Sequence, residues 1–289
     1  MSADTVQAAD RGRGARLTQA LAHAAGLGLA RLDAQLLLLH ALGRAQHERA
    51  WLLAHDEDPL IPACQEAFEA LCARRVAGEP LAYLVGQKEF FGLMLSVDRR
   101  VLVPRPDTET LVEWALERLD GRRAPAVLDL GTGSGAIALA IKHRRSDASV
   151  EAVDNSAGAL ALARENGKRL GLQVGWRMAS WLQDAPTGLD LIVSNPPYIE
   201  TSDPHLAALG HEPMAALASG PDGLQDLREI VARAPQHLAP GGWLLLEHGW
   251  NQAAAVRALL DAAGFGQVAS RRDLAGIERC SGGQWPPAA

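Results

Sequence analysis

The sequence predicts an α/β protein in which a doubly wound, mostly parallel sheet follows a small helical bundle. Three observations support this prediction. The 289 residues exceed the length of an average domain, so two domains are expected. Up to residue 78, apolar residues recur at helical spacing between glycine and proline breakers. From residue 108 onward, short apolar runs alternate with helix-forming segments, as strands and crossover helices do in a parallel sheet.

The amino-terminal part of the chain is expected to form several short helices. Four segments show helical periodicity, namely residues 17–25, 30–42, 47–54 and 64–78. Residues 78–106 then gain β-type residues and turn glycines, which favours a hairpin. The predicted organisation is therefore a helical domain at 1–85, a hairpin-bearing linker at 86–107 and an α/β domain at 108–289.

The α/β part alternates strand-like and helix-like segments. The expected strands lie in segments 126–135, 150–156, 189–198 and 241–249, and the expected helices in 108–119, 137–144, 159–170 and 223–238. Residues 264–285 carry two more strand-like runs with no long helix between them. Because parallel neighbours need a long crossover, this tail predicts an antiparallel pair that completes the sheet.

Charge and composition weigh against several classes of function. The formal net charge of −6 supplies no basic excess, so stable binding of long nucleic acid is not expected. No run of about 18 apolar residues is present, and residues 1–14 lack the apolar core of a signal peptide. Cys64, Cys72 and Cys280 form no CxxC pair, so we expect packing roles and no metal site. These features predict a cytoplasmic protein without a membrane span.

A glycine-rich loop follows the first strand of the α/β part. Its sequence is Gly131-Thr132-Gly133-Ser134-Gly135, and Asp129 precedes it. Glycines at this place allow a tight turn and a close approach of a ligand to the backbone. Asp154 ends the next strand, where its carboxylate can accept the protons of ribose hydroxyls. The spacing of the loop is GxGxG. An acid such as Asp154 can bind the ribose of NAD or of S-adenosylmethionine equally well. Another motif is therefore needed to choose between these two ligands.

That motif is Asn195-Pro196-Pro197-Tyr198, at the carboxyl end of a predicted strand, where two prolines restrict the backbone. A neutral amide nitrogen is a poor nucleophile because its lone pair is delocalised. We expect the Asn195 side-chain oxygen and the Pro196 carbonyl to accept the two N–H groups of such a substrate, while Tyr198 packs on its plane. Alignment of this kind contributes roughly 7–11 kcal/mol without a general base.

Four longer segments extend the pattern, at residues 74–93, 101–116, 193–200 and 244–250. With GTGSG and NPPY, the chain resembles amino methyltransferases, which modify exocyclic nitrogens of adenine, cytosine or glutamine. Together the four segments resemble the peptide chain release factor glutamine methyltransferase family over most of residues 20–280. NPPY is shared with DNA methyltransferases. The sequence PRPDTE, Pro104 to Glu109, is far more specific when combined with a helical amino-terminal domain.

The resemblance implies a class I methyltransferase fold, with a doubly wound, mostly parallel seven-stranded sheet and an antiparallel final strand. It implies S-adenosyl-L-methionine as the cofactor and no metal. Residues 131–135 would surround the methionine part, Asp154 would hold the ribose, and Trp181 would lie beside the adenine. Residues 195–198 would hold the substrate glutamine, with Asn195 also next to the cofactor. Ser180 stands where such enzymes often have an acid.

The family's substrate is the glutamine of a Gly-Gly-Gln motif in class 1 peptide chain release factors, which the helical domain would recognise. We expect a monomer. The chain itself contains Gly282-Gly283-Gln284 near its end. This tail is interpreted as a turn after the last strand, and imitation of the substrate is an alternative. Arg105 and Glu109 are candidates for an ion pair.

Other functions remain open from the sequence alone. The same NPPY chemistry suits N6-methylation of a flipped adenine. Another translation protein, such as a ribosomal protein, is a second possible source of the glutamine. An inactive, cofactor-binding adaptor and a dehydrogenase are more distant readings. Glu247, His248 and Trp250 are interpreted as structural and are left out of the site.

Overall fold

The computed structural model describes residues 15–287. Their contacts divide the chain into two compact units with the boundary between Gly86 and Gln87. The predicted absence of a signal peptide concerns residues 1–14, which lie outside the described residues. In the part that the structure describes, no helix is both long and apolar enough to cross a bilayer.

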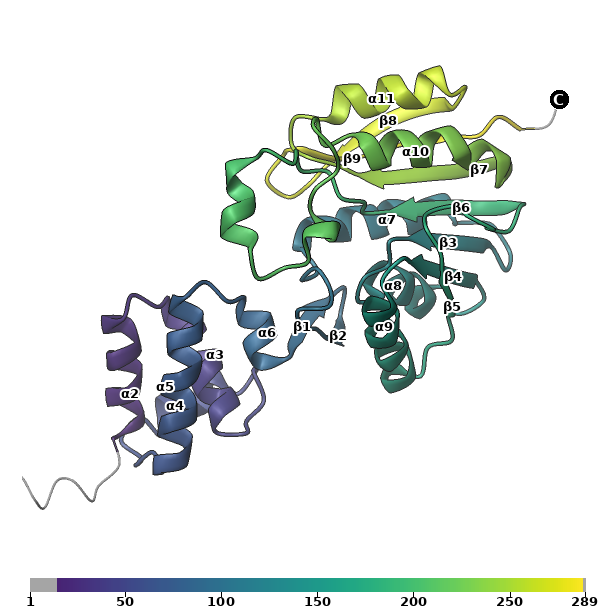
Figure 1. Ribbon diagram of the computed structural model, residues 1–289. Helices are drawn as coiled ribbons and strands as arrows, with labels where there is room; N and C mark the ends of the chain where they lie inside the picture. The colour runs from purple at the N-terminus through teal and green to yellow at the C-terminus, as the bar shows by residue number, and fades with distance from the viewer. Residues whose placement is uncertain (1–14, 288–289) are drawn as a thin grey trace, which may run out of the picture. The chain divides into compact units, whose positions relative to one another are not determined.

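The first unit is a bundle of short helices (Figure 1). They are α2 (Leu17–Gly26), α3 (Arg31–Ala41), α4 (Arg49–Ala54), α5 (Pro62–Val76) and α6 (Leu81–Val85). Helix α3 packs against each of the other four. Its Leu37, Leu38 and Leu39 are fully buried, together with Phe68 and Cys72 of α5. This central apolar helix therefore organises the bundle's core.

The second unit begins with an antiparallel hairpin of β1 (Gln87–Phe90) and β2 (Leu93–Ser96). Phe91 and Gly92 form its two-residue turn, and both have positive φ angles of 52° and 79°. Two-residue hairpin turns commonly need this backbone geometry. The hairpin thus belongs by its contacts to the second unit.

The second unit is built on one seven-stranded sheet, with strand order β5-β4-β3-β6-β7-β9-β8 (Figure 1). The strands are β3 (Ala126–Leu130), β4 (Ser149–Asp154), β5 (Gly175–Met178), β6 (Leu189–Ser194), β7 (Leu238–Glu247), β8 (Gly266–Arg272) and β9 (Glu278–Gln284). The strands from β5 to β7 pair in parallel, and β9 is antiparallel to both β7 and β8. The predicted fold class, including the antiparallel final strand, is confirmed.

Helices cover both faces of this sheet. They are α7 (Glu109–Arg118), α8 (Ala136–Arg144), α9 (Ala157–Leu170), α10 (Gln225–Arg233) and α11 (Ala253–Ala262); the 3-10 turns η2 (Pro106–Thr108) and η5 (Ala234–Gln236) adjoin α7 and α10. Successive strand residues point to opposite faces. Accordingly, Val127 packs in the core that contains α7 and α8, and Leu128 packs in the core that contains α10 and α11.

The Gly282-Gly283-Gln284 segment lies inside β9, so both interpretations of it, as a turn and as a substrate imitation, are wrong. Gly282 and Gly283 pair with Leu245 and Leu244 of β7. A Cβ on Gly282 would lie 2.5 Å from the Leu245 side chain. Glycine is present because this strand approaches its neighbours too closely for a side chain.

Candidate active site

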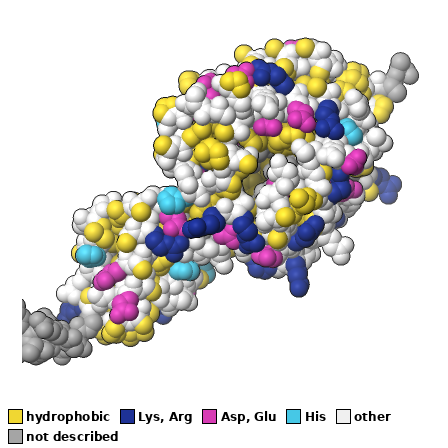
Figure 2. Space-filling model, in the orientation of Figure 1, with side chains coloured by type: hydrophobic (Ala, Val, Ile, Leu, Met, Phe, Trp, Pro, Cys, Tyr) yellow, Lys and Arg dark blue, Asp and Glu magenta, His cyan; other side chains and the backbone are white. Residues whose placement is uncertain are grey.

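A pocket opens where the carboxyl ends of β3, β4 and β6 meet at one edge of the sheet. Open α/β sheets bind ligands at this edge. The pocket is lined by most of the predicted site residues: Gly131, Thr132, Gly133, Ser134, Asp154, Trp181, Asn195 and Pro197. Figure 2 shows a hollow on this face of the second unit, with apolar side chains around it. Gly135, Pro196 and Tyr198 were also predicted for the site, but they do not line the pocket.

The glycine loop needs glycine at each of its three positions. Gly131, Gly133 and Gly135 have φ angles of 67°, 55° and 84°, in the left-handed region that other residues rarely adopt. A Cβ on Gly131 would lie 3.1 Å from the ring of Trp181. One on Gly135 would lie 3.0 Å from Leu139. The loop therefore keeps its backbone exposed to the pocket and ends where α8 begins.

Asp129 supports the glycine loop from beneath. Its Oδ2 accepts the Thr132 hydroxyl at 2.6 Å and the Ala138 N–H at 3.2 Å. The side chain is fully buried, and its Oδ1 has no hydrogen-bond partner among the described residues. Burial raises the pKa of Asp129 to about 7. This carboxyl fixes the loop, and its unpaired oxygen adds negative potential below the pocket.

Asp154 holds the same loop from the end of β4. Its Oδ2 accepts the Gly133 N–H at 2.9 Å, and its Oδ1 accepts the Ser156 N–H at 2.8 Å. Burial raises the pKa of this carboxyl. Because a carboxylate oxygen has more than one acceptor position, both oxygens can still accept ribose hydroxyls. Asp154 therefore shapes the loop and faces the ligand at once.

Trp181 forms one wall of the pocket. Its indole N–H donates to Asp226 Oδ1 at 3.1 Å, at the start of α10. Its ring lies against Gly131, and its backbone has an unusual positive φ of 44°. An indole fixed at both ends offers a rigid apolar surface to a planar ring such as adenine.

The Asn195 side chain reaches the pocket from the end of β6. Its Nδ2 donates to the Thr108 hydroxyl oxygen at 3.2 Å. Because the amide is planar, its Oδ1 points away from Thr108 and remains available as an acceptor. Behind it, Tyr198 is half-buried and its hydroxyl donates to Glu247 Oε1 at 3.4 Å. Burial and the nearby Glu247 raise the pKa of the Tyr198 phenol.

Two segments that line the pocket contain none of the predicted site residues. One side is lined by Arg100, Val101, Leu102, Pro104, Arg105 and Thr108, and the family resemblance of the PRPDTE motif places that segment near the cofactor. Pro213, Ala215 and Ala216 line another side, and no sequence signal identified them.

Buried Glu212 joins these two segments. It pairs with Arg105 at 2.5 Å and accepts the Val103 N–H at 3.0 Å. The predicted Arg105–Glu109 ion pair is therefore wrong. Glu109 instead accepts the Phe91 N–H at 3.0 Å in the hairpin turn.

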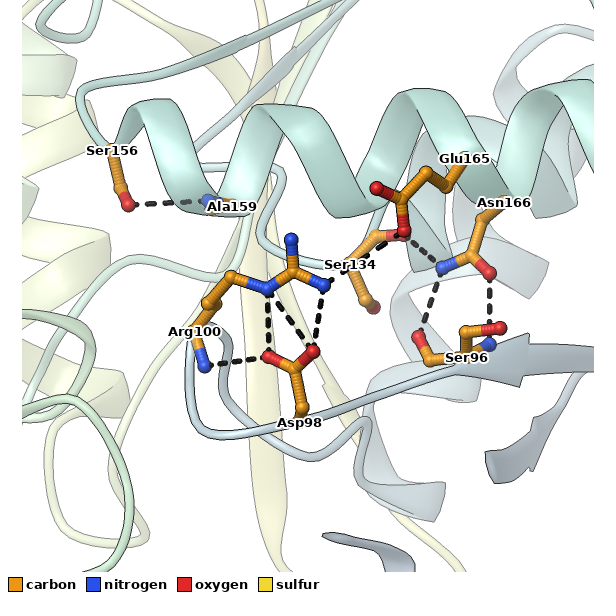
Figure 3. Close-up of polar contacts among 8 residues, drawn as sticks. All are labelled: Ser96, Asp98, Arg100, Ser134, Ser156, Ala159, Glu165 and Asn166. Atoms are coloured by element: carbon orange, nitrogen blue, oxygen red, sulfur yellow. Dashed lines mark hydrogen bonds and ion pairs between the residues drawn. The ribbon is translucent and has the colours of Figure 1, made fainter. Parts of the chain in front are cut away.

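The β1–β2 hairpin is fastened to the glycine loop through Asn166 (Figure 3). The buried Asn166 accepts the Ser96 N–H at 2.8 Å and donates to the carbonyls of Ser96 and Ser134, each at 3.0 Å. Arg100, at the pocket's rim, pairs with Asp98 at 2.6 Å. Segments far apart in sequence thus fix one wall of the site.

The charges of the pocket fit S-adenosylmethionine better than a dinucleotide. The Gly133 N–H, which a pyrophosphate would need, is already committed to Asp154. The arginines at the pocket, Arg100 and Arg105, are each paired with an acid. Within residues 15–287, the carboxyls of Asp129 and Asp154 form no ion pair with a cationic side chain. Negative potential suits a cofactor that carries a sulfonium and an ammonium group. No cluster of metal-binding side chains is found within residues 15–287.

Comparisons with known proteins agree with this geometry. Two family models match the chain, the PrmC N-terminal domain over residues 15–86 and the methyltransferase small domain over residues 110–220. A release factor glutamine methyltransferase from Bordetella pertussis (strain Tohama I) is 55% identical over 260 residues, which cover 89% of this chain and 95% of that protein. One from Xylella fastidiosa (strain Temecula1) is 51% identical over 272 residues, which cover 92% of this chain and 98% of the relative.

A solved structure with a similar fold is the methyltransferase from Pyrococcus furiosus. It is 20% identical, has a TM-score of 0.54, and is matched over 75% of this chain and 98% of its own. At this identity the likeness concerns the fold alone. The relatives are matched along most of their length. The chain therefore belongs to the release factor glutamine methyltransferase family, as the motifs in its sequence predict.

Proposed function

We propose that this protein transfers a methyl group from S-adenosyl-L-methionine to the side-chain amide nitrogen of the glutamine in the Gly-Gly-Gln motif of class 1 release factors. One observation carries the proposal furthest. Asn195 stands at the pocket with its Nδ2 committed to Thr108, which leaves its Oδ1 as an acceptor for a substrate N–H. The names of relatives that are 51–55% identical supply the substrate class.

The cofactor would lie along the edge of the sheet. Residues 131–135 would surround its methionine part, with Thr132 and Ser134 between the glycines. Asp154 would accept the ribose hydroxyls, and the ring of Trp181 would pack beside the adenine. When bound, S-adenosylmethionine supplies the methyl group on an activated sulfonium centre.

The chain's contribution to the chemical step is alignment. Asn195 Oδ1 and the Pro196 carbonyl accept the two N–H groups, which turns the nitrogen lone pair toward the methyl carbon. Tyr198 and Pro197 support the substrate amide, and Tyr198 is held through Glu247. The nitrogen forms the new N–C bond as the C–S bond breaks, and it then releases one proton to water. Positioning alone accounts for roughly 7–11 kcal/mol of such a barrier.

The helical unit, residues 1–85, is proposed to recognise the release factor. Large apolar side chains are exposed on it: Leu27, Leu32, Leu53, Ile61 and Val76. Replacing Leu53 and Ile61 together by serine in the full-length protein should raise the KM for release factor and leave the KM for the cofactor unchanged. An unaltered KM for release factor would remove these two side chains from the interface.

We further propose that the protein acts as a monomer in the cytoplasm and does not bind nucleic acid stably. The net charge of −6 is poorly suited to a polyanion. Light scattering of the purified protein and a gel-shift titration with RNA and DNA test the two parts separately.

The central experiment is transfer of labelled methyl from S-adenosylmethionine to purified release factor. It compares the wild type, Asn195→Ala, and a release factor in which the Gly-Gly-Gln glutamine is replaced by alanine. Label is expected only when both residues are intact. Label on adenine-containing nucleic acid instead would assign base methylation, and label on a ribosomal protein would assign another glutamine. Cofactor binding without any transfer would favour the adaptor.

A further inference from the structure

Behind the NPPY motif lies a buried carboxyl group that the proposed chemistry does not use directly. Glu247, the last residue of β7, is 1% exposed. Its Oε1 accepts the Tyr198 hydroxyl at 3.4 Å, and its Oε2 has no hydrogen-bond partner in the described part of the chain. A buried acceptor without a donor is costly, so such a group calls for an explanation.

Thr108 lies between this carboxyl and Asn195. Its side chain is buried, and its oxygen accepts the Asn195 Nδ2 at 3.2 Å. Burial raises the pKa of the Glu247 carboxyl, and the side chain of Thr108 is the strongest of the neighbours that lower it. A threonine hydroxyl has one proton to donate, and an ionised carboxyl can only accept. The proton of Thr108 and the unpaired oxygen of Glu247 are therefore complementary.

The direction of these hydrogen bonds matters because an asparagine amide can be placed in two ways. If Thr108 donated to Asn195, the amide would turn over and present its NH₂ group to the pocket. That NH₂ group would then meet the N–H groups of the substrate amide, donor against donor, and no hydrogen bond could form between them. An acceptor beside Thr108 prevents this by taking the hydroxyl proton, so that Thr108 offers Asn195 only a lone pair.

We propose that Glu247 is a positioning residue that acts through the Thr108 hydroxyl to hold Asn195 with its carbonyl oxygen toward the substrate. The same carboxylate also accepts the Tyr198 hydroxyl at 3.4 Å, a long hydrogen bond. This inference rests on the proposed role of Asn195.

Several charged groups surround the Glu247 carboxyl. Arg279 lowers its pKa and Asp107 raises it, while the buried Cys280 thiol also lies near. Arg279 is itself shared between Asp273 at 3.3 Å and Asp107 at 3.7 Å. No arginine thus pairs with Glu247 among the ion pairs of the described residues.

The test is made at pH 8, where most of Glu247 is ionised, and uses full-length protein with three substitutions that keep the shape of the site. Thr108→Val removes the hydroxyl, Thr108→Ser restores it, and Glu247→Gln removes the acceptor-only character of the carboxylate. Thr108→Val and Glu247→Gln are expected to lower kcat about 10- to 100-fold, as loss of a group that orients a reacting residue does. The dissociation constant for S-adenosylmethionine should stay within about twofold. Thr108→Ser should retain most of the wild-type kcat.

A double substitution separates positioning from a general structural effect. If Glu247 acts through the Thr108 hydroxyl, then Glu247→Gln added to Thr108→Val should cause no further loss of kcat in single-turnover labelling. An additional 10-fold loss in that background would overturn the inference. So would a wild-type kcat in both Thr108→Val and Glu247→Gln while Asn195→Ala is inactive. Full activity of Asn195→Ala would instead contradict the proposed function itself.

Discussion

The Asp154 carboxylate accepts the Gly133 N–H at 2.9 Å, so the end of β4 holds the turn that follows β3. One side chain therefore fixes the backbone of the glycine loop and faces the pocket in which a ribose is expected. Charge-assisted hydrogen bonds of this kind contribute about 1.5–3 kcal/mol each. The loop's shape and its affinity for a ligand consequently depend on the same group.

Replacing Asp154 by asparagine should weaken binding of S-adenosylmethionine about 10- to 100-fold, because the amide has one acceptor oxygen where the carboxylate has two. The kcat at saturating cofactor should change far less. Calorimetric titration measures the affinity. Asp147→Asn, at an exposed acid outside the pocket, is the control and should bind normally. Equal affinity in Asp154→Asn and wild type would remove Asp154 from the cofactor site.

Gly131→Ala is expected to lower cofactor affinity and the free energy of unfolding together. The residue has φ 67°, and its new Cβ would press on the Trp181 ring at 3.1 Å. Gly28→Ala is a matched control, since Gly28 has φ 86° but no described atom within 4 Å of the added carbon. The strain of a positive φ, about 1 kcal/mol, is then common to both. Only Gly131→Ala should lose binding, and loss in both would point to global unfolding.

Gly282→Ala should destabilise the protein by about 1–3 kcal/mol or more, because the added carbon meets Leu245 at 2.5 Å and the Leu244 carbonyl at 2.6 Å in a packed core. Gly266→Ala, in the neighbouring strand, meets nothing closer than 4.0 Å and should be nearly neutral. Urea unfolding compares the two. Gln284→Ala should keep the wild-type kcat, and a methyl group on Gln284 in mass spectrometry would revive the discarded substrate imitation.

The pKa of Glu247 predicts a pH-dependent stability difference. Burial raises that pKa to about 7 from an ordinary value of 4.5. The folded protein therefore binds this proton more tightly than the unfolded chain, and the associated stability, complete below about pH 4.5, is lost as the pH rises through 7. Glu247→Gln removes this ionisation. Its free energy of unfolding relative to wild type should rise by about 2–3 kcal/mol between pH 5 and pH 8.

Urea titrations at both pH values measure this difference. Asp129, which also has a pKa of about 7, affects wild type and variant alike and cancels. A constant difference for Glu247→Gln would show that Glu247 ionises normally in the folded state. With the expected fall in kcat, this variant would be more stable and less active at pH 8.

The local motifs of the site could be predicted because each one follows its strand directly. The carboxyl ends of parallel strands meet at one edge of the sheet. This brings together the glycine loop after β3, the acid at the end of β4 and the asparagine at the end of β6. The partners of these residues could not be predicted. Glu212 bonds Val103 across 109 positions of sequence, and Thr108 meets Asn195 across 87. Such pairs depend on how the loops pack against one another. The periodicity of apolar residues in the sequence carries no information about that packing.

The carboxyl-terminal glycines illustrate a second limit. Adjacent glycines favour a turn when only local propensity is considered. In β9, Gly282 is required instead by the approach of Leu245 and Trp114, and Gly283 by the approach of Phe265. The identity of the residue is thus explained by its neighbours in space. The same holds for Glu247, a strand-ending acid whose surroundings, and not its position in the sequence, set its pKa.

The two prolines of the NPPY motif also decide what the site rejects. Pro196 and Pro197 have no backbone N–H, and the Tyr198 N–H is committed to the Leu217 carbonyl at 3.2 Å. In the proposed mechanism the strand end would thus offer the substrate only acceptors, namely the Asn195 side-chain oxygen and the Pro196 carbonyl. A glutamate side chain, identical in shape to glutamine, would bring oxygens against oxygens and be repelled. A release factor whose glutamine has deamidated would therefore remain unmodified, because the enzyme recognises nitrogen and not shape.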